Sequence, residues 1–292
     1  MQTARSPRIV HAPTPREFAA IADRGEPVVL TGVTDAWPAL ERWRDADYLR
    51  ARAGDAVVPV EVYPGGDTGR HASYVSRNLR VSQFLDEMAH KPGAPAMFLV
   101  VPLPAHLPQL LDDVPAPPIL SGISRTIWLL GDRTFSNLHF HPFQNSLACQ
   151  VVGRKRFGLY PPSETRHLYP RHWLSKWFEF TRIESFNPVD LARYPDVGRA
   201  RGVEVTLEPG MALFIPRHWW HWASTDEVAS HVLYYFGASD RARWLWTSPG
   251  RRSLFWMGRF AAERAVGRLR KKIEARLGIA PPPPPDGDQP AR

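Results

Sequence analysis

The most informative stretch of this chain is SNLHFHPFQNSLACQVVGRKRFGLYPP (residues 136–162), in which short β-type runs alternate with turn residues. Similar runs, each broken by Gly or Pro, continue to residue 236 and include VEVTLEPG, MALFIP and SHVLYYFG. Many short strands with such turns are typical of a barrel or a sandwich rather than a layered α/β fold. The sequence therefore predicts a mainly β domain over residues 123–236. Before it we expect a polar lead-in (1–26) with a short helix over 15–24, a helix over 39–54, and a helix over 81–90 that Ser82 caps.

Two histidines in this stretch, His139 and His141, are candidates for metal binding. In a strand, successive side chains point to opposite faces, so these two share one face while Phe140 points the other way. Neutral imidazole is a ligand that suits Fe, Zn, Cu or Ni. The alternative is a pair of histidines on a solvated face, and the short HxH pattern alone does not separate the two interpretations.

A third histidine strengthens the metal interpretation. The segment PGMALFIPRHWWHW (209–222) contains a strand that begins at a glycine turn, then a proline, then His221 among three tryptophans. We interpret His221 as an interior ligand with a dry tryptophan wall around it. His218, three residues earlier, is expected to lie at the surface or behind the ligands.

Lys155 is a candidate for anion binding. Alternation in RKRFGLY puts Lys155 on the same face as Phe157 and Leu159. A lysine on an inward apolar face needs an anionic partner, because an unpaired buried ammonium group is very costly. A bound carboxylate would be such a partner. The alternative is a lysine near a strand end that extends to water.

From residue 26 to residue 236 the chain resembles the JmjC-related, cupin-like hydroxylases (the cupin-8 branch), which are iron(II)- and 2-oxoglutarate-dependent oxygenases. The resemblance rests on ordered segments, namely EPVVLTGVTDAWPALERW, LPQLLDDVPAP, WLLGDRTFSNLHFHPFQN, GRKRFGLYPPSETRHLYP, LARYP and LEPGMALFIPRHWWHW. It implies a double-stranded β-helix, a cupin or jelly-roll barrel, with flanking N- and C-terminal helices.

The resemblance also implies roles for particular residues. In that family iron is held by a His-x-Asp/Glu…His triad with open positions for co-substrate and oxygen. The metal ligands implied here are His139, His141 and His221. Lys155 falls on the lysine that pairs with the distal carboxylate of 2-oxoglutarate. Ser136 and Asn145 fall where polar partners of the co-substrate or the metal shell are usual.

The chain departs from the family pattern in three places. His141 stands where a carboxylate is expected, which raises the net charge of the site by one and removes a strong anionic ligand. The run 145–153 is one residue longer than expected, which predicts a register shift or a bulge. Leu233 stands where the family often has a polar asparagine.

Three functional hypotheses follow. The first is an iron(II)- and 2-oxoglutarate-dependent oxygenase that hydroxylates a C–H bond of a protein, a peptide or a small molecule. The second is a three-histidine cupin dioxygenase that does not use 2-oxoglutarate, because HxH and the spacing of Gly210, Pro216 and His221 also fit a general cupin pattern. The third is a catalytically silent, cupin-like binding protein.

The positive charge of the chain is concentrated at one end. Of a net charge of +8, residues 240–277 carry eleven Arg or Lys against three Asp or Glu. We expect a barrel domain with its N-terminal flanking elements (1–239), a basic helical segment (240–277) and a disordered proline-rich tail (278–292). The helical segment is expected to pack on the barrel or to form a homodimer, and nucleic acid is not an expected partner.

Cysteine content and hydropathy bear on location. The single cysteine, Cys149, is expected to be a small buried hydrophobe rather than a nucleophile. No uninterrupted apolar stretch of transmembrane length occurs, and the N-terminus lacks the apolar core of a secretory signal. We therefore expect no transmembrane segment and a reducing, cytoplasmic location.

Overall fold

The computed structural model describes residues 6–64, 74–88, 95–175, 177–186, 188–237 and 247–276. Its strands are β1 (Arg8–His11), β2 (Val28–Thr31), β3 (Val57–Tyr63), β4 (Val75–Arg80), β5 (Ala96–Pro102), β6 (Ile123–Asp132), β7 (Phe135–His139), β8 (Asn145–Val152), β9 (Lys155–Tyr160), β10 (Val203–Leu207), β11 (Ala212–Ile215), β12 (Trp220–Ser224) and β13 (Val228–Phe236). Its α-helices are α1 (Pro15–Arg24), α2 (Ala39–Arg42), α3 (Ala46–Ala53), α4 (Val81–Met88), α5 (Leu103–His106) and α6 (Ser248–Arg276). Three short 3-10 helices are η1 (Pro108–Asp113), η2 (Pro162–His167) and η3 (Pro195–Arg199).

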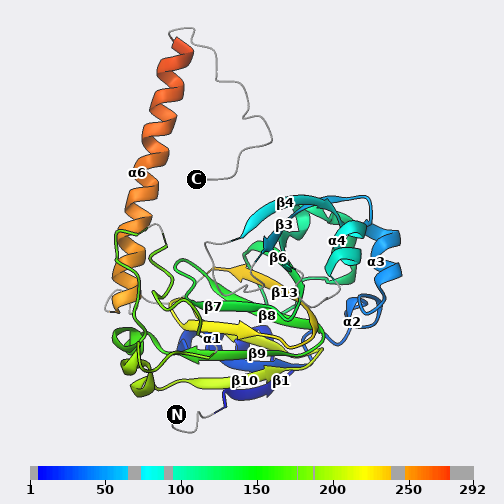
Figure 1. Cartoon of the computed structure of the whole chain (residues 1–292), viewed down its shortest axis with the longest axis horizontal. Helices are drawn as coiled ribbons and strands as arrows, with labels where there is room; N and C mark the ends of the chain where they lie inside the picture. The colour runs from blue at the N-terminus through cyan, green and yellow to red at the C-terminus, as the bar shows by residue number, and fades with distance from the viewer. Residues whose placement is uncertain are drawn as a thin grey trace.

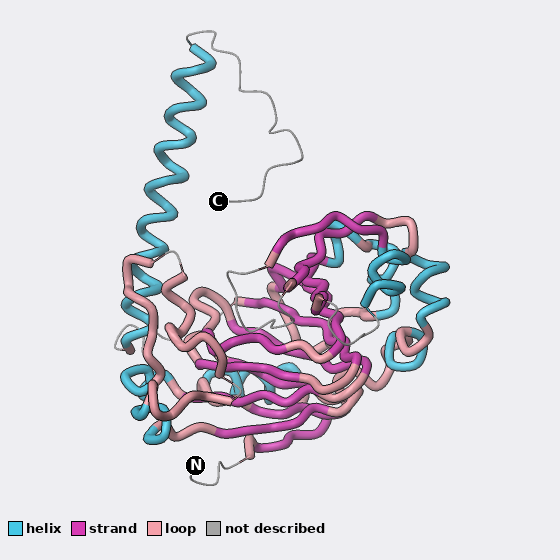
Figure 2. The backbone as a smooth tube through the Cα atoms, in the orientation of Figure 1, coloured by secondary structure: helices cyan, strands magenta, loops and turns pink. Residues whose placement is uncertain are grey.

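The strands form two sheets (Figure 1). The larger has the order β1-β2-β11-β8-β13-β6-β5-β3-β4, and the smaller has the order β10-β9-β12-β7. Apart from the parallel pair β1 and β2, neighbouring strands are antiparallel. Figure 2 shows the strands forming the body of the molecule with the helices around it. The predicted mainly β, jelly-roll barrel with flanking helices is confirmed.

Local sequence signals explain where the first helix begins and ends. Thr14 caps α1, since its hydroxyl accepts from the backbone N–H of Glu17 (3.3 Å), while the Glu17 carboxylate accepts from the backbone N–H of Thr14 (2.8 Å). Gly25, with φ of 68°, ends the helix in the left-handed region. Phe18 and Ile21 then pack into the core against the larger sheet. The predicted helix over 15–24 is confirmed.

Three details of the N-terminal half differ from prediction. The polar lead-in contains a strand, β1, and the edge strand β4 was not predicted because its residues are mostly exposed and do not alternate. The single helix predicted over 39–54 is two helices, since Asp45 accepts from the N–H of Asp47 and starts α3 anew. Ser82 is not a cap, because it lies inside α4 and its hydroxyl donates to the Gly54 carbonyl.

A buried carboxylate ties the Pro-rich connection 104–122 to the N-terminal helices. Asp113, 1% exposed, accepts from Trp43 Nε1 (3.0 Å), from the Tyr48 hydroxyl (2.7 Å) and from the Arg42 guanidinium (2.9 Å). These bonds satisfy the carboxylate inside an apolar layer. The layer covers the outer face of the larger sheet, which leaves the inner face for the barrel interior.

The extra residue in the run 145–153 forms the predicted bulge. Between β8 and β13, Ser230 pairs with Val152 but His231 pairs with Gln150, so Val151 is the additional residue. A bulge bends one strand and changes where nearby side chains point. This bulge lies directly beside His231, which lines the barrel cavity.

Helix α6 leaves the barrel and extends away from it (Figure 1). Its first turns are anchored, because Trp256 stacks on Phe178 with 5.4 Å between ring centroids. Further along, Val266 and Leu269 are exposed. The tail 278–292, residues 240–246 and residue 277 lie outside the described residues, so the three-part division of the chain stays a prediction. Within the described ranges, no helix combines the length and apolar character that a membrane crossing requires.

Candidate metal centre

Three histidines converge at one end of the smaller sheet. His139 ends β7, and His221 lies opposite it on β12. His141 lies two residues beyond the end of β7, not within the strand as predicted. Ring centroids are 4.3 Å apart for His139 and His221, 4.6 Å for His141 and His221, and 5.5 Å for His139 and His141. One nitrogen of each residue lies within 4.8 Å of the others, so a single ion could contact all three.

Hydrogen bonds orient these imidazoles. Nδ1 of His139 lies 2.7 Å from the Asn137 carbonyl oxygen, and Nδ1 of His221 lies 3.0 Å from the Trp219 carbonyl oxygen. A carbonyl oxygen only accepts, so in both residues Nδ1 carries the proton and Nε2 keeps a free lone pair. Nδ1 of His141 lies 2.9 Å from the Ser146 hydroxyl. Metal-binding histidines in proteins are commonly held by such an outer hydrogen bond.

The three imidazoles are held neutral. Burial lowers the pKa of His139. Burial, and then the neighbouring histidines, lower the pKa of His141 and His221 well below the ordinary value. A neutral imidazole at physiological pH is the form that binds a metal ion, so no proton has to be removed first.

The histidines line a cavity of about 600 Å³ between the two sheets. Its wall is mainly apolar and includes Val100, Leu129, Phe157 and Ile215. Besides the three histidines, the polar residues that line it include Glu61, Arg125, Ser136, Lys155, Glu179, His231 and Tyr235. Such a concave, mostly apolar space with a few convergent polar groups is typical of a small-molecule or co-substrate site.

Lys155 lies in this cavity, as predicted, and does not extend to water. It is 3% exposed, and burial lowers its pKa to about 7. Its Nζ lies 3.4 Å from Nδ1 of His231 and 5.4 Å from the ring centroid of Phe98. Within the described ranges no carboxylate forms an ion pair with it. A carboxylate ligand would therefore supply the anionic partner that this buried ammonium group lacks.

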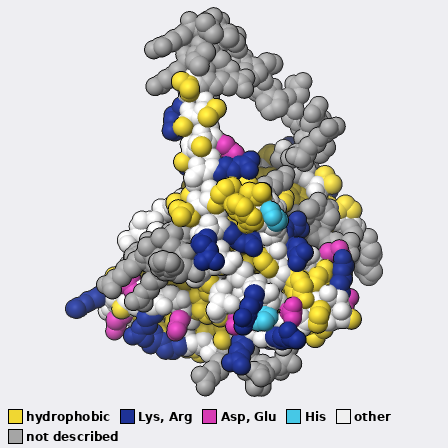
Figure 3. All heavy atoms as spheres, turned by 90° about the vertical axis from the view of Figure 1, so that its left-hand side faces the viewer, with side chains coloured by type: hydrophobic (Ala, Val, Ile, Leu, Met, Phe, Trp, Pro, Cys, Tyr) yellow, Lys and Arg dark blue, Asp and Glu magenta, His cyan; other side chains and the backbone are white. Residues whose placement is uncertain are grey.

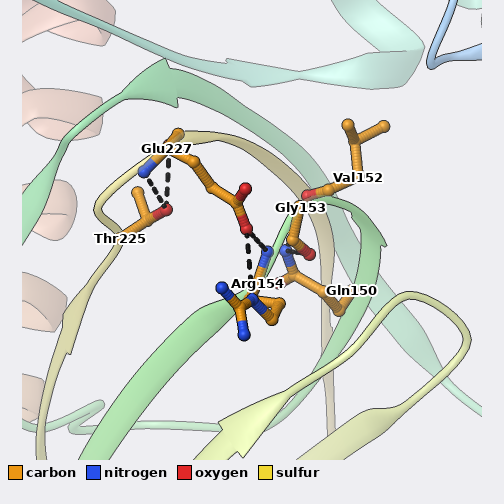
Figure 4. A network of polar contacts seen from close by, with 6 residues as sticks. All are labelled: Gln150, Val152, Gly153, Arg154, Thr225 and Glu227. Atoms are coloured by element: carbon orange, nitrogen blue, oxygen red, sulfur yellow. Dashed lines mark hydrogen bonds and ion pairs between the residues drawn. The ribbon is translucent and has the colours of Figure 1, made fainter.

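The turn before Lys155 is held by a network on the larger sheet (Figure 4). Gly153 adopts φ of 63°, and a Cβ there would lie 2.3 Å from the Val228 carbonyl oxygen, so only glycine fits. Gln150 donates to the carbonyls of Val152 and Gly153 (2.8 and 3.0 Å), and the Glu227 carboxylate accepts from the N–H of Arg154 (2.8 Å). This rigid turn determines where strand β9 starts and directs Lys155 inward.

The other predicted residues divide between cavity and scaffold. Ser136 lines the cavity. Asn145 is buried but is not among the lining residues, and its Oδ1 accepts from the N–H of Arg217 (2.9 Å). His218 is 1% exposed, and its Nε2 lies 2.9 Å from the Pro142 carbonyl oxygen. We expected His218 either at the surface or behind the metal ligands, and the second position is confirmed. Asn145 bonds to the neighbouring residue Arg217, so it supports the same loop.

The predicted tryptophan wall around His221 is wrong. Trp220 and Trp222 point to the opposite face of β12 and pack with Phe140 in a separate core cluster. Trp219 donates from Nε1 to the Gly25 carbonyl (2.8 Å), beside α1. Strand alternation is the reason, since the immediate neighbours of an inward residue face outward.

Sequence patterns did not identify several cavity residues, among them Tyr235, His231 and Glu179. Tyr235, whose pKa burial raises to about 12, has its hydroxyl 3.2 Å from Nε2 of His141. Alternation in SHVLYYF puts His231, Leu233 and Tyr235 on one face, so that signal was present. Glu179 comes from the loop 161–200, for which the sequence gives no periodic signal. Burial raises its pKa to about 7, and its Oε2 has no hydrogen-bond partner among the described residues.

The residues present fit a divalent transition metal. Three neutral imidazole nitrogens would hold such an ion at the wall of the cavity, where a co-substrate in the cavity could reach it. Each ring has an outer hydrogen-bond partner, which is the usual support of a metal ligand. The usual carboxylate ligand is absent at position 141, so the donor set is neutral.

Comparisons with known proteins bear on the family of the chain. Residues 14–242 match the model of a family described as "Cupin-like domain". The chain is 33% identical over 246 residues to "Lysine-specific demethylase 8" of Danio rerio (80% of this chain, 59% of that protein). It is 31% identical over 225 residues to "Lysine-specific demethylase JMJ30" of Arabidopsis thaliana (73% and 50%). It is 28% identical over 239 residues to "Jumonji C domain-containing protein 5" of Drosophila melanogaster (77% and 58%).

The chain spans between half and three-fifths of the length of these relatives. The match to the family model nevertheless covers strands β2 to β13 and the N-terminal helices, including every residue of the candidate site. The jelly-roll architecture and the extent of the match lead to one conclusion. The chain belongs to the JmjC-related, cupin-like domain family.

Proposed function

We propose that this protein is an iron(II)- and 2-oxoglutarate-dependent oxygenase that hydroxylates a C–H bond of its substrate. The observation that carries the proposal is one cavity holding both three converging neutral histidines and a buried lysine without a carboxylate partner. The first group fits a metal and the second fits an anionic co-substrate. Membership of the JmjC-related family supports the same activity.

The residues of the chain have distinct roles in this proposal. His139, His141 and His221 would hold iron, which when bound provides open positions for the 2-oxo acid and O₂ and the oxidising power for the reaction. The ammonium group of Lys155 would bind the distal carboxylate of 2-oxoglutarate. The apolar wall, including Leu129 and Phe157, keeps water from the reacting groups.

Histidine at position 141 changes the charge of the site. Three neutral ligands leave the charge of Fe(II) uncompensated, whereas a carboxylate ligand would offset one unit. A doubly charged anion such as 2-oxoglutarate would offset it when bound, with Lys155 stabilising the distal end. We therefore propose that metal and co-substrate binding are strongly coupled in this protein.

Two carboxylates in the cavity favour a substrate with a cationic group. Glu61 and Glu179 both line the cavity, and burial raises the pKa of each. A cation beside them would lower both pKa values, because it stabilises the ionised carboxylates that burial has removed from water. Two of the relatives are named lysine-specific demethylases, so a lysine side chain of a protein is the first class to test. Peptides and small molecules with a cationic group remain within the proposal.

The test is anaerobic reconstitution of the full chain with Fe(II) and 2-oxoglutarate, followed by exposure to O₂. We expect a visible charge-transfer band before O₂ and succinate formation afterwards. A variant carrying His139→Ala and His221→Ala should lose both, whereas His172→Gln, at an exposed histidine, should keep both. Failure of the wild type to form the band at saturating ligand would exclude 2-oxoglutarate turnover.

The second candidate is a three-histidine dioxygenase that does not use 2-oxoglutarate. The neutral donor set His139, His141 and His221 is the observation that favours it. It predicts iron-dependent O₂ uptake with substrate, insensitive both to 2-oxoglutarate and to Lys155→Met. A catalytically silent binding protein predicts neither O₂ uptake nor an effect of the double histidine variant on its biological activity.

A homodimer through α6 stays a prediction. Three apolar residues of this helix that could form such an interface, Leu254, Phe255 and Met257, are exposed. Figure 3 shows apolar side chains where α6 leaves the body. Trp256 is buried on the barrel, so it is not available to a partner. Sedimentation of the chain with and without residues 247–292 tests this, since a dimer helix predicts monomers after truncation.

The cytoplasmic location also stays a prediction, which cell fractionation would test.

A further inference from the structure

His231 lies in the middle of the cavity wall. It belongs to β13, a central strand of the larger sheet, and it is 5% exposed. Its side chain faces the cavity together with those of Leu233 and Tyr235. The alternate residues Val232 and Tyr234 face the other way, into the core beneath the N-terminal helices. His231 is therefore an inward residue and no part of the surface.

His231 and Lys155 join the two sheets across the barrel interior. Lys155 comes from β9 in the smaller sheet and His231 from β13 in the larger, 76 residues apart in sequence. Nζ of Lys155 lies 3.4 Å from Nδ1 of His231. Phe98 lies under the ammonium group at 5.4 Å, and Phe157 meets the imidazole edge-on at 6.4 Å. Aromatic rings thus surround a pair of nitrogen groups.

The pair presents only hydrogen-bond donors to the cavity. An ammonium group has no acceptor, so Nδ1 of His231 accepts from Lys155 and Nε2 of His231 carries the ring proton. The pair then offers the remaining N–H groups of Lys155 and the Nε2–H of His231. Within the described ranges, neither residue bonds to a carboxylate. Donors without an acceptor, in a space that a ligand can enter, fit an anion.

The charge of the pair fits a single carboxylate. Burial, and then the charge of Lys155, lower the pKa of His231 well below its ordinary value, so the imidazole is neutral. The pair therefore carries at most one positive charge. A second cation would repel the first and would also compete with the metal for the negative charge of the ligand. A neutral imidazole adds a donor without adding charge.

The bulge in β8 lies next to both members of this pair. The register shift lies between Ser230 and His231, opposite the additional residue Val151. The same extra residue precedes the turn at Gly153, from which Lys155 starts β9. One local irregularity thus affects the position of both members of the pair.

We propose that His231 is the second group that binds the distal carboxylate of the 2-oxo acid, beside Lys155, and that it contributes to selection of a dicarboxylate. This inference rests on the proposed function for the identity of the ligand. The site itself requires only a carboxylate between the two sheets. His231 is a specificity residue in this account and is not one of the three histidines that would hold the metal.

The experiment is calorimetric binding to the Mn(II)-loaded full chain with three probes. They are 2-oxoglutarate, 2-oxovalerate (equal chain length without the distal carboxylate) and glutarate (both carboxylates without the oxo group). We expect His231→Leu to weaken 2-oxoglutarate and glutarate by about 10- to 100-fold, as for a lost hydrogen bond to a charged group. Binding of 2-oxovalerate should not change. His231→Gln, whose amide N–H can occupy the place of Nε2–H, should recover most of the loss.

Controls separate this role from a structural one. Leu233→Val alters the same cavity face without removing a donor, and should change the three affinities by one common factor. Equal weakening of 2-oxoglutarate and 2-oxovalerate by His231→Leu, with unchanged Mn(II) affinity, would overturn the inference. If the wild type binds glutarate through His231 but neither 2-oxo acid, the carboxylate site stands and the proposed co-substrate is wrong. If it binds none of the probes, both fail.

Discussion

The hydroxyl oxygen of Tyr235 lies 3.2 Å from Nε2 of His141, the nitrogen through which His141 would bind a metal. In the tautomer that leaves Nε2 free for a metal, Nδ1 of the same ring donates to the Ser146 hydroxyl and Nε2 accepts from the phenol. A metal ion has to displace this hydrogen bond. Tyr235 therefore competes with the metal in the absence of any co-substrate.

Replacing Tyr235 by Phe should strengthen metal binding. One hydrogen bond of about 1 kcal/mol no longer has to be broken, which corresponds to an increase in Mn(II) affinity of roughly fivefold. Competition with a coloured chelator measures the affinity. His141→Ala, which removes the ligand itself, should lower the affinity by far more. Unchanged or weaker binding by Tyr235→Phe would show that the hydroxyl does not compete.

Replacing Ser146 by Ala should weaken metal binding. Ser146 is fully buried, and its hydroxyl is the outer partner of His141. Loss of such a partner typically lowers metal affinity by about 10- to 100-fold, because the ring is no longer held in orientation. The exposed Ser163→Ala is the matched control and should bind Mn(II) like the wild type. Equal affinities for both variants would remove Ser146 from the site.

Binding of 2-oxoglutarate should depend on pH through Lys155. In the empty cavity its pKa is lowered to about 7 by burial, and the carboxylate binds the ammonium form. Below about pH 7 that form is already present, so affinity is constant. Above it, binding takes up a proton, and affinity falls by up to about tenfold per pH unit.

Calorimetry in buffers of different ionisation enthalpy detects this proton uptake. In Lys155→Arg the arginine stays charged throughout this pH range. The affinity of this variant for 2-oxoglutarate should therefore not change with pH through proton uptake at position 155. A wild-type affinity that stays constant from about pH 6 to about pH 9 would mean that the lysine is already charged in the empty cavity.

Replacing Trp256 by Ala should destabilise the attachment of α6. Trp256 is 3% exposed, stacks on Phe178 and donates from Nε1 to the Trp173 carbonyl (2.8 Å). Truncation of a buried tryptophan typically costs about 3–5 kcal/mol of unfolding free energy. Urea unfolding measures the loss, and limited proteolysis should cut within 247–276 more readily. Met257→Ala, at an exposed neighbour, should stay within about 0.5 kcal/mol of wild type. Two equally small effects would mean that α6 is not docked.

Replacing Asp113 by Ala should cost about 3 kcal/mol of unfolding free energy. The buried Trp43 Nε1 and the half-buried Tyr48 hydroxyl would lose their shared acceptor, and unsatisfied donors away from water are costly. The neighbouring, exposed Asp112→Ala is the matched control and should change stability little. Similar values for the two variants in urea unfolding would contradict the role assigned to Asp113.

Local patterns predicted much of the molecule. Period-two alternation and turn residues gave most of the strands from 123 to 236, because the side-chain period of a strand is a property of neighbouring residues. The helix predicted over 15–24 is α1, whose start the structure shows to be stabilised by Thr14 and Glu17 through contacts within one turn. The inward direction of Lys155 followed from alternation in the same way. Edge strands β1 and β4 were missed, since their stability comes from pairing and not from a buried face.

The sequence by itself determined that His139, His221 and Lys155 belong to inward-facing positions of a barrel, because alternation and turn chemistry act over a few residues. Only the tertiary structure decided that Tyr235 lies against His141, that His231 lies against Lys155 and that Glu179 enters the same cavity. The first two pairs are separated by 94 and 76 residues. The physical reason is that such contacts depend on how two sheets close over one another, including one bulge in β8, and no local pattern encodes that distance.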